Sequence, residues 1–172
     1  MSRLPVAGLV TAALLFAADQ LGKYVVTGPL GIDYLGASKT LLPIFDLRFV
    51  PNQGISLGLL HADSSTARWL LVLLTAGIAV VVSVWMARER NRADQIGLGL
   101  VLGGALGNIL DRVRLGYVVD LLDLHFGEWR PFLVFNLADT AITMGVLVLL
   151  VRALLTRDAP RRGTASVENG NA

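Results

Sequence analysis

The chain has 172 residues, of which 54% are hydrophobic and only 16% are charged, and its mean hydropathy is +0.63. This composition indicates a membrane protein, and the net charge of +2 is too small to predict nucleic acid as a partner. Cysteine is absent, which excludes disulfides, thiolate catalysis and cysteine-ligated metals.

Four apolar segments are long enough, or nearly so, to cross a bilayer as helices. A helix rises about 1.5 Å per residue, so the hydrocarbon core of roughly 30 Å requires about 20 apolar residues. The first segment is interpreted as a retained span, because no clean A-x-A cleavage site follows it. The predicted spans are residues 5–26, 69–87, 95–110 and 135–155. The predicted fold class is therefore a mainly α, integral membrane protein.

Arginine-rich segments predict the orientation in the membrane. The tight connection RERNRAD after the second span contains three arginines, and the tail contains Arg157, Arg161 and Arg162. The positive-inside rule places both segments, and hence both termini, in the cytoplasm. We expect residues 1–156 to form one domain and residues 157–172, which are polar and aperiodic, to form a disordered cytoplasmic tail.

The outer segments, residues 28–67 and 112–134, are predicted to be structured. TLLPIFDLRFV and GYVVDLLDLHF have β-branched, partly alternating patterns that favour a small strand-rich cradle on the outer side. HADSSTARW offers capping residues before the second span. In the third span, glycines at positions 99, 103 and 107 recur every four residues, which favours close helix packing in lipid.

Several aspartates are predicted to gather at the outer end of the helices. At about 1.5 Å per residue, Asp19 lies roughly 22 Å along the first span and Asp111 roughly 24 Å along the third. Asp139 opens the fourth span from the outer side, and Asp120 lies in the outer segment before it. Ionisable residues at membrane depth are costly and usually mark function.

Helical spacing pairs some of these acids with cations. Lys23 follows Asp19 by four residues, and Arg112 adjoins Asp111 on a polar stripe that begins at Asn108. The simplest role for the Asp19–Lys23 and Asp111–Arg112 sets is ion pairing that holds the helices in register.

Asp120 and Asp139 have no cation at a corresponding spacing. A simple role is open for Asp139, because an aspartate near a helix start can cap backbone N–H groups. Two neighbouring carboxyl groups cannot both ionise cheaply, however, so one can stay protonated as an acid while the other deprotonates a water molecule. Such a pair can hydrolyse peptides without a metal or a covalent intermediate.

Other catalytic chemistries have weaker motifs. H-E-x-x-H does not occur, and His61 and His125 fit polar loop residues better than metal ligands. A serine–lysine dyad of Ser56 and Lys23 stays open, although Asp19 beside the lysine favours its charged form.

Two classes of protein without peptidase activity are alternatives. A small transporter or proton-conducting bundle also contains intramembrane acids, but it would favour charges at mid-membrane rather than at one end. A structural scaffold accounts for the glycines and leaves Asp120 and Asp139 without a role.

Five motifs follow one another along the chain: DQLGK at 19–23, VPNQGISLG at 50–58, GGALGNILDR at 103–112, GYVVDLLDL at 116–124 and FNLAD at 135–139. In their order and spacing they resemble those of the lipoprotein signal peptidases (signal peptidase II), integral-membrane aspartic proteases of bacteria. The likeness covers nearly the whole chain up to the tail, and five motifs in the family's order are more specific than any one of them. One departure is Leu57, which stands where such sequences commonly have an aromatic residue.

The resemblance implies a site and a substrate. Asp120 and Asp139 would form the catalytic dyad, and the substrate would be a prolipoprotein that carries diacylglyceryl on its lipobox cysteine and is cut just before that cysteine. The residues implied to bind substrate or support the site are Asp19, Lys23, Asn52, Gly54, Asn108, Asp111, Arg112 and Asn136.

The resemblance also implies the surroundings of the enzyme. We expect a multi-pass, monomeric protein of the bacterial cytoplasmic (inner) membrane, in contact with membrane lipid, whose active site lies near the outer face. We expect no metal or other cofactor, and binding of the family inhibitor globomycin near the dyad.

Overall fold

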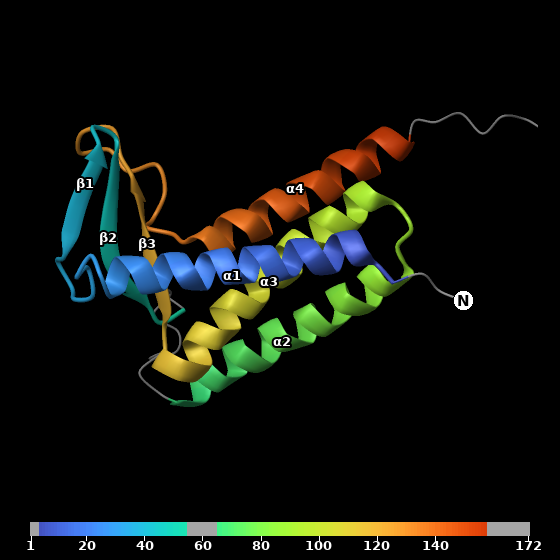
Figure 1. Cartoon of the computed structure of the whole chain (residues 1–172), viewed down its shortest axis with the longest axis horizontal. Coiled ribbons are helices and arrows are strands. Elements are labelled where there is room, and N and C mark those ends of the chain that lie inside the picture. The colour runs from blue at the N-terminus through green and yellow to red at the C-terminus, as the bar shows by residue number, and fades with distance from the viewer. Residues whose placement is uncertain (1–3, 55–64, 158–172) are drawn as a thin grey trace, which may run out of the picture.

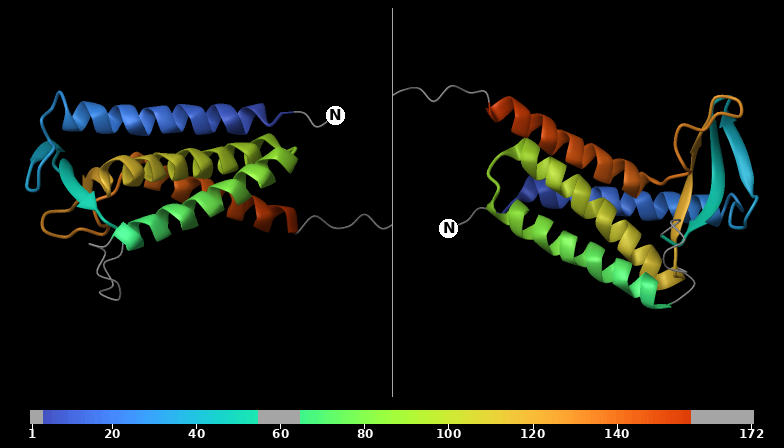
Figure 2. Two further views of the ribbon diagram at one scale, coloured as in Figure 1. Left: turned by 90° about the horizontal axis from the view of Figure 1, so that it is seen from below. Right: turned by 180° about the vertical axis from the view of Figure 1, so that it is seen from behind.

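A computed structural model describes residues 4–54 and 65–157 of the chain. Four long helices run side by side and a small sheet lies across one end of them, opposite the end where the first helix begins and the last one finishes (Figures 1 and 2). The elements in chain order are α1 (Val6–Thr27), β1 (Ser38–Leu42), β2 (Phe45–Asn52), α2 (Ser65–Arg88), α3 (Arg92–Leu115), β3 (Val118–Leu124) and α4 (Leu137–Arg157).

The four predicted spans are confirmed as helices long and apolar enough to cross a membrane. Their ends differ from the predicted ones: α2 begins at Ser65 rather than at residue 69, and α3 continues to Leu115 rather than stopping at residue 110. Asp111 and Arg112 therefore belong to the helix itself, and Asp111 is buried there. Residues 158–172, Ser56, Leu57, His61 and the capping stretch 61–64 lie outside the described residues.

Helix α3 is the central helix and packs against each of the other three. Its glycines make this possible, as their spacing predicts: a Cβ atom on Gly103 would lie only 2.6 Å from the carbonyl oxygen of Ala12 in α1. By contrast, a Cβ atom on Gly77 in α2 would meet nothing within 4 Å. Close backbone contact along α3 thus replaces the hydrophobic driving force that lipid cannot supply between helices.

The sheet is antiparallel with the strand order β1-β2-β3. The predicted strand pattern around residues 40–50 is split into two strands by a turn at Pro43–Ile44, because proline cannot donate to a strand ladder. An apolar cluster that includes Val26 in the last turn of α1, Ile32 after it, Phe49 of β2 and Leu121 of β3 fixes the sheet to the end of the helices. The sheet therefore covers the end at which the predicted acids gather.

Candidate active site

Strand β3 and the start of α4 bring the two suspected acids together. The backbone of Phe135 forms a short bridge with β3: its N–H donates to Leu122 O at 3.0 Å, and its carbonyl oxygen accepts from the N–H of Leu122 at 2.8 Å. This bridge places Asn136, the next residue, beside Asp120. One further step along the chain begins α4, which bears Asp139 in its first turn.

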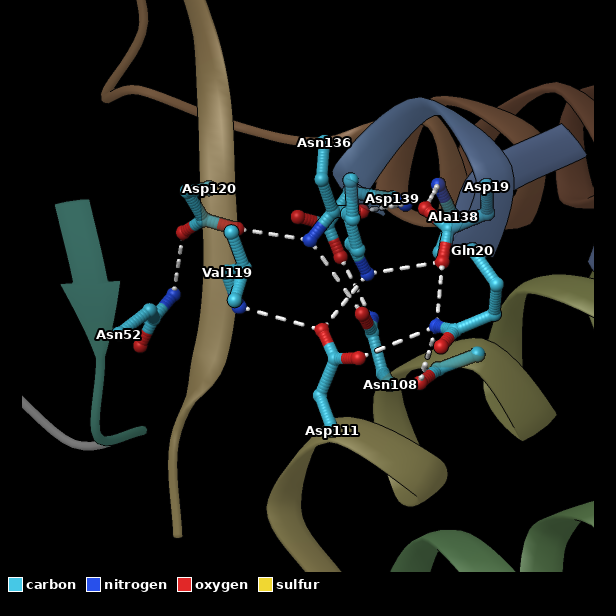
Figure 3. Close-up of polar contacts among 12 residues, drawn as sticks. Asp19, Gln20, Asn52, Asn108, Asp111, Val119, Asp120, Asn136, Ala138 and Asp139 are labelled. Carbon is cyan, nitrogen blue, oxygen red and sulfur yellow. Dashed lines mark hydrogen bonds and ion pairs between the residues drawn. The ribbon is translucent and has the colours of Figure 1, made fainter. Parts of the chain in front are cut away.

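Amide groups bind both oxygens of the Asp120 carboxylate. Asn136 Nδ2 donates to Oδ1 at 2.7 Å, and Asn52 Nδ2, at the end of β2, donates to Oδ2 at 2.9 Å (Figure 3). Asp120 is only 1% exposed, and no described cation forms a salt bridge with it.

A chain of amides links Asp120 to Asp139. Asn136 Nδ2 also lies 3.3 Å from Asn108 Oδ1, and Asn108 Nδ2 donates to Asp139 Oδ1 at 2.8 Å (Figure 3). Asp139 is half-buried, so it is the more accessible of the two acids. Within the described chain it forms no salt bridge either.

The helix-cap role that was open for Asp139 is filled by other residues. Asn136 Oδ1 accepts the backbone N–H of Asp139 at 2.8 Å, and Asp19 Oδ1 accepts that of Ala138 at 3.1 Å. These two side chains satisfy N–H groups that a helix start leaves without partners. The carboxylate of Asp139 is left to face Asn108 and the surface.

The environment of Asp120 favours its protonated form. Burial, as the largest cause, and the nearby charge of Asp139 raise the pKa of Asp120 to about 6, while the hydrogen bonds from Asn52 and Asn136 lower it in part. The strand thus holds a carboxyl group with a raised pKa, linked through amides to a second carboxyl group.

Two further buried acids, Asp19 and Asp111, share one cation. Lys23 Nζ lies 2.8 Å from Asp19 Oδ2 and 2.7 Å from Asp111 Oδ2. The predicted Asp19–Lys23 pair is confirmed, but the predicted Asp111–Arg112 pair is wrong. Adjacent helical residues point about 100° apart, so Asp111 faces α1 while Arg112 does not.

This cluster around Lys23 also holds the backbone next to each suspected acid. Asp19 accepts the N–H of Ala138, which precedes Asp139, and Asp111 Oδ2 accepts the N–H of Val119, which precedes Asp120, at 3.1 Å. The charged cluster therefore positions β3 and α4 relative to each other.

The remaining predicted residues lie at the edge of the site. Gly54 has φ = +110°, a conformation that favours glycine, and its N–H donates to Asn52 Oδ1 at 2.9 Å. This turn aims the Asn52 amide at Asp120. Arg112 Nη2 lies 3.8 Å from where a Cβ atom on Gly54 would stand, and Arg112 Nε has no hydrogen-bond partner among the described residues.

Two features were missed by the sequence reasoning. Gln20 Nε2 donates to Asp19 Oδ2 at 3.1 Å and to Asp111 Oδ1 at 3.0 Å, so it joins α1 to α3. Asp123 is 1% exposed and binds two arginines, with Arg130 Nε at 3.1 Å and Arg48 Nη1 at 3.5 Å from its Oδ2. The acidic periodicity of β3 hinted at the second feature, and the place of Gln20 inside the DQLGK motif was the available signal for the first.

Metal-ligand geometry is not found in the described part of the chain, where no group of three His, Cys, Asp or Glu residues could hold an ion. His125 directly follows β3, and its Nε2 lies 3.3 Å from Asp46 Oδ2. His61 lies outside the described residues.

Comparison with known proteins places the chain among membrane peptidases. The sequence profile of the family described as "Signal peptidase (SPase) II" matches residues 11–155. A lipoprotein signal peptidase of Rhizorhabdus wittichii is 52% identical over 88% of this chain and 87% of its own length. That of Sphingopyxis alaskensis is 51% identical over 86% and 85%.

The fold is shared with a solved structure described as a bacterial membrane enzyme. It has a TM-score of 0.75 and 26% sequence identity, and the match covers 88% of this chain and 94% of that chain. Fold and family together show that the chain is a multi-pass membrane peptidase. It belongs to the signal peptidase II family.

Proposed function

We propose that the protein is an aspartic endopeptidase that removes signal peptides from diacylglyceryl-modified prolipoproteins by cutting just before the lipidated cysteine. Its relatives of 52% and 51% identity are named lipoprotein signal peptidases, which supports the substrate class. The single observation that supports the catalytic type is the pair Asp120 and Asp139, because side-chain amides link these two acids and neither forms a salt bridge with a described residue.

The proposed mechanism assigns different roles to the two acids. Asp120, whose pKa is raised to about 6 chiefly by burial, holds the proton and acts as the general acid. Asp139, which is more accessible, takes a proton from a water molecule that attacks the scissile carbonyl carbon. Asp120 then protonates the leaving nitrogen as the C–N bond breaks, and the dyad has exchanged one proton between its members.

The supporting residues position this pair and the peptide. Asn52 and Asn136 hold the Asp120 carboxyl group, and Asn108 holds that of Asp139. Arg112, whose Nε has no described hydrogen-bond partner, would donate to a substrate carbonyl group. Lys23 contacts two carboxylates, so we do not assign it as the base of a serine–lysine dyad.

The proposed orientation puts this site near the outer face of the cytoplasmic membrane, with both termini inside. The arginines between α2 and α3 lie at the end of the helices opposite the sheet, which supports the orientation by the positive-inside rule (Figure 1). A diacylglyceryl group and an apolar signal helix are both held in the bilayer, so the bond between them lies at the interface where the site opens.

The test is cleavage of a diacylglyceryl-modified lipobox peptide by the purified protein in lipid nanodiscs, with the products identified by mass spectrometry. We expect one cut, before the lipidated cysteine, and little cleavage of the same peptide without lipid. Cleavage that is indifferent to the lipid, or that survives in both Asp120→Asn and Asp139→Asn, would contradict the proposal.

A further inference from the structure

A cavity at the end of the bundle opposite the sheet has no role in the proposed reaction. It measures about 1300 Å³, which is larger than the roughly 300–1,000 Å³ of ordinary small-molecule pockets. It lies where α1 begins and α2 ends, beside the first turns of α3 (Figures 1 and 2). Its position separates it from the aspartate site by the length of the helices.

The walls of the cavity are apolar and its rim is basic. Val6, Val10 and Ile96 are among the apolar side chains that line it, and Val6 and Val10 are half or more exposed. The charged residues that line it are Arg88, Glu89, Arg90 and Arg92. Three cations therefore face one anion beside a surface that suits hydrocarbon.

The rim arginines are not neutralised by the protein. None of the three forms an ion pair with a described residue. Glu89 is engaged elsewhere, since its Oε1 accepts the backbone N–H groups of Arg90 at 2.7 Å and Asn91 at 2.8 Å. The carboxylate thus fixes the connection between α2 and α3 and leaves the guanidinium groups free to bind another anion.

The connection that bears the arginines is also well ordered by hydrogen bonds. Gln95, which is 9% exposed, donates to the carbonyl oxygen of Glu89 at 2.9 Å, and Asn91 caps α3 by accepting the N–H of Ala93 at 2.9 Å. These hydrogen bonds fix the backbone from which the arginines project, so the ordering cost of binding there is reduced.

We propose that this cavity binds an anionic phospholipid of the inner leaflet, with its acyl chains against α1 and α3 and its phosphate on the arginines. Basic pockets between membrane helices on the cytoplasmic side bind anionic headgroups by the same chemistry. A substrate signal helix is a poorer occupant, because the positively charged start of a signal peptide would meet these arginines. The inference rests on the proposed orientation but not on the peptidase activity.

The test is lipid retention by the purified protein, measured by native mass spectrometry. Phosphatidylglycerol and phosphatidylcholine with identical acyl chains are titrated in separate arms, together with inorganic phosphate. We expect phosphatidylglycerol to bind more tightly than phosphatidylcholine, and phosphate alone not to compete. Equal retention of the two lipids, or displacement by phosphate at the same concentration, would overturn the proposal.

Two kinds of variant localise the lipid. Arg88→Gln, Arg90→Gln and Arg92→Gln combined should weaken phosphatidylglycerol binding on the order of a hundredfold, since each arginine contributes about 1 kcal/mol, or roughly fivefold. Lys39→Gln, which removes an exposed cation from β1 at the other end, should change nothing.

Val10→Trp keeps every arginine and therefore the determinants of orientation, but fills the cavity. It should lower the retention of phosphatidylglycerol, whereas Leu21→Trp, at a 62% exposed position of α1 outside the cavity, should not. Undiminished binding in both the Val10→Trp and the triple arginine variants would show that the lipid binds elsewhere.

Discussion

Asp120 and Asp123 lie three residues apart on one strand and are each 1% exposed, yet their partners differ in kind. Asp123 contacts two arginines, whereas Asp120 contacts two amides and no described cation. Cations stabilise a buried carboxylate in its charged form, while amides satisfy its oxygens and leave burial to raise the pKa. The partners of a buried acid, more than its depth, therefore separate a structural acid from one suited to catalysis.

Asp19 and Asp111 resemble Asp123 in that they are buried acids paired with a cation. They share Lys23 and Gln20 as partners, and each accepts a backbone N–H next to a dyad residue. Their task is to hold β3 and α4 in place. In this site the ion-paired acids support the structure, whereas the carboxyl groups held by amides are those that we propose to be catalytic.

The largest expected effect comes from removing either carboxyl group of the proposed catalytic dyad. Asp120→Asn and Asp139→Asn should each reduce cleavage by on the order of 10²–10⁴-fold or more, because an amide cannot transfer the proton that the mechanism requires. The measurement is kcat/KM on the lipidated peptide, with the detergent melting temperature as the control for folding. Activity within a few-fold of the wild type in a folded variant would remove that acid from the dyad.

Lys23→Met tests the structural role of the ion-paired acids. It leaves Asp19 and Asp111 buried without a cation, and breaking one partner of a buried pair costs about 3–5 kcal/mol. We expect a large drop in melting temperature and a loss of activity that follows the loss of fold. Lys39→Met, which removes an exposed lysine, is the matched control and should melt like the wild type.

Asp123→Asn contrasts directly with Asp120→Asn. It should cost about 1–3 kcal/mol of stability, since an arginine left over can turn to solvent, and it should leave kcat/KM within a few-fold of the wild type. The two arginine side chains are 42% and 43% exposed, which gives them that freedom. A catalytically dead but stable Asp123→Asn protein would mean that the comparison between the two acids is drawn wrongly.

The smallest expected effect is a shift in pH dependence. As the general acid, Asp120 must be protonated, so kcat/KM should fall as the pH rises through about 6. The hydrogen bond from Asn52 lowers the pKa of Asp120, so Asn52→Ala should move this limb to higher pH. A limb that stays in place in Asn52→Ala would assign it to another group.

The raised pKa of Asp120 should also change how the stability of the fold depends on pH. A carboxyl group whose pKa is higher in the folded than in the unfolded state stabilises the fold below its unfolded pKa, and that contribution is lost as the pH rises through the folded value. The melting temperature of the wild type should therefore fall relative to that of Asp120→Asn between about pH 4 and pH 7. Parallel curves over this range would mean that the pKa of Asp120 is not raised.

Much of this architecture could be predicted from the sequence because it depends on strong, local signals. Long apolar runs predicted the four helices, and helical rise alone predicted that Asp19 and Asp111 lie towards the same end of the bundle. The convergence of Asp120 and Asp139 could be inferred only from the resemblance, since the bridge between Phe135 and Leu122 depends on how the chain returns across the sheet.

Partner choice was the part that the sequence could not supply. Spacing along one helix favoured Arg112 as the partner of Asp111, but a cation from another helix, Lys23, is closer. Likewise Asn136 and Asp19, rather than Asp139, cap α4, because capping depends on which side chains the tertiary fold brings near the helix start. Contacts between segments that are distant in the sequence cannot be predicted from the local pattern of residues.

The most direct test of the central claim is to titrate the Asp120 carboxyl group itself. Difference infrared spectroscopy can follow the carbonyl stretch of a protonated carboxyl group against pH, and a band absent from Asp120→Asn belongs to that residue. The account predicts that this band disappears with a pKa of about 6 in the wild type, and at lower pH in Asp139→Asn, since the Asp139 charge raises the value. A midpoint near the ordinary value of 3.8 in the wild type, or one that ignores Asp139→Asn, would contradict the shared-proton dyad.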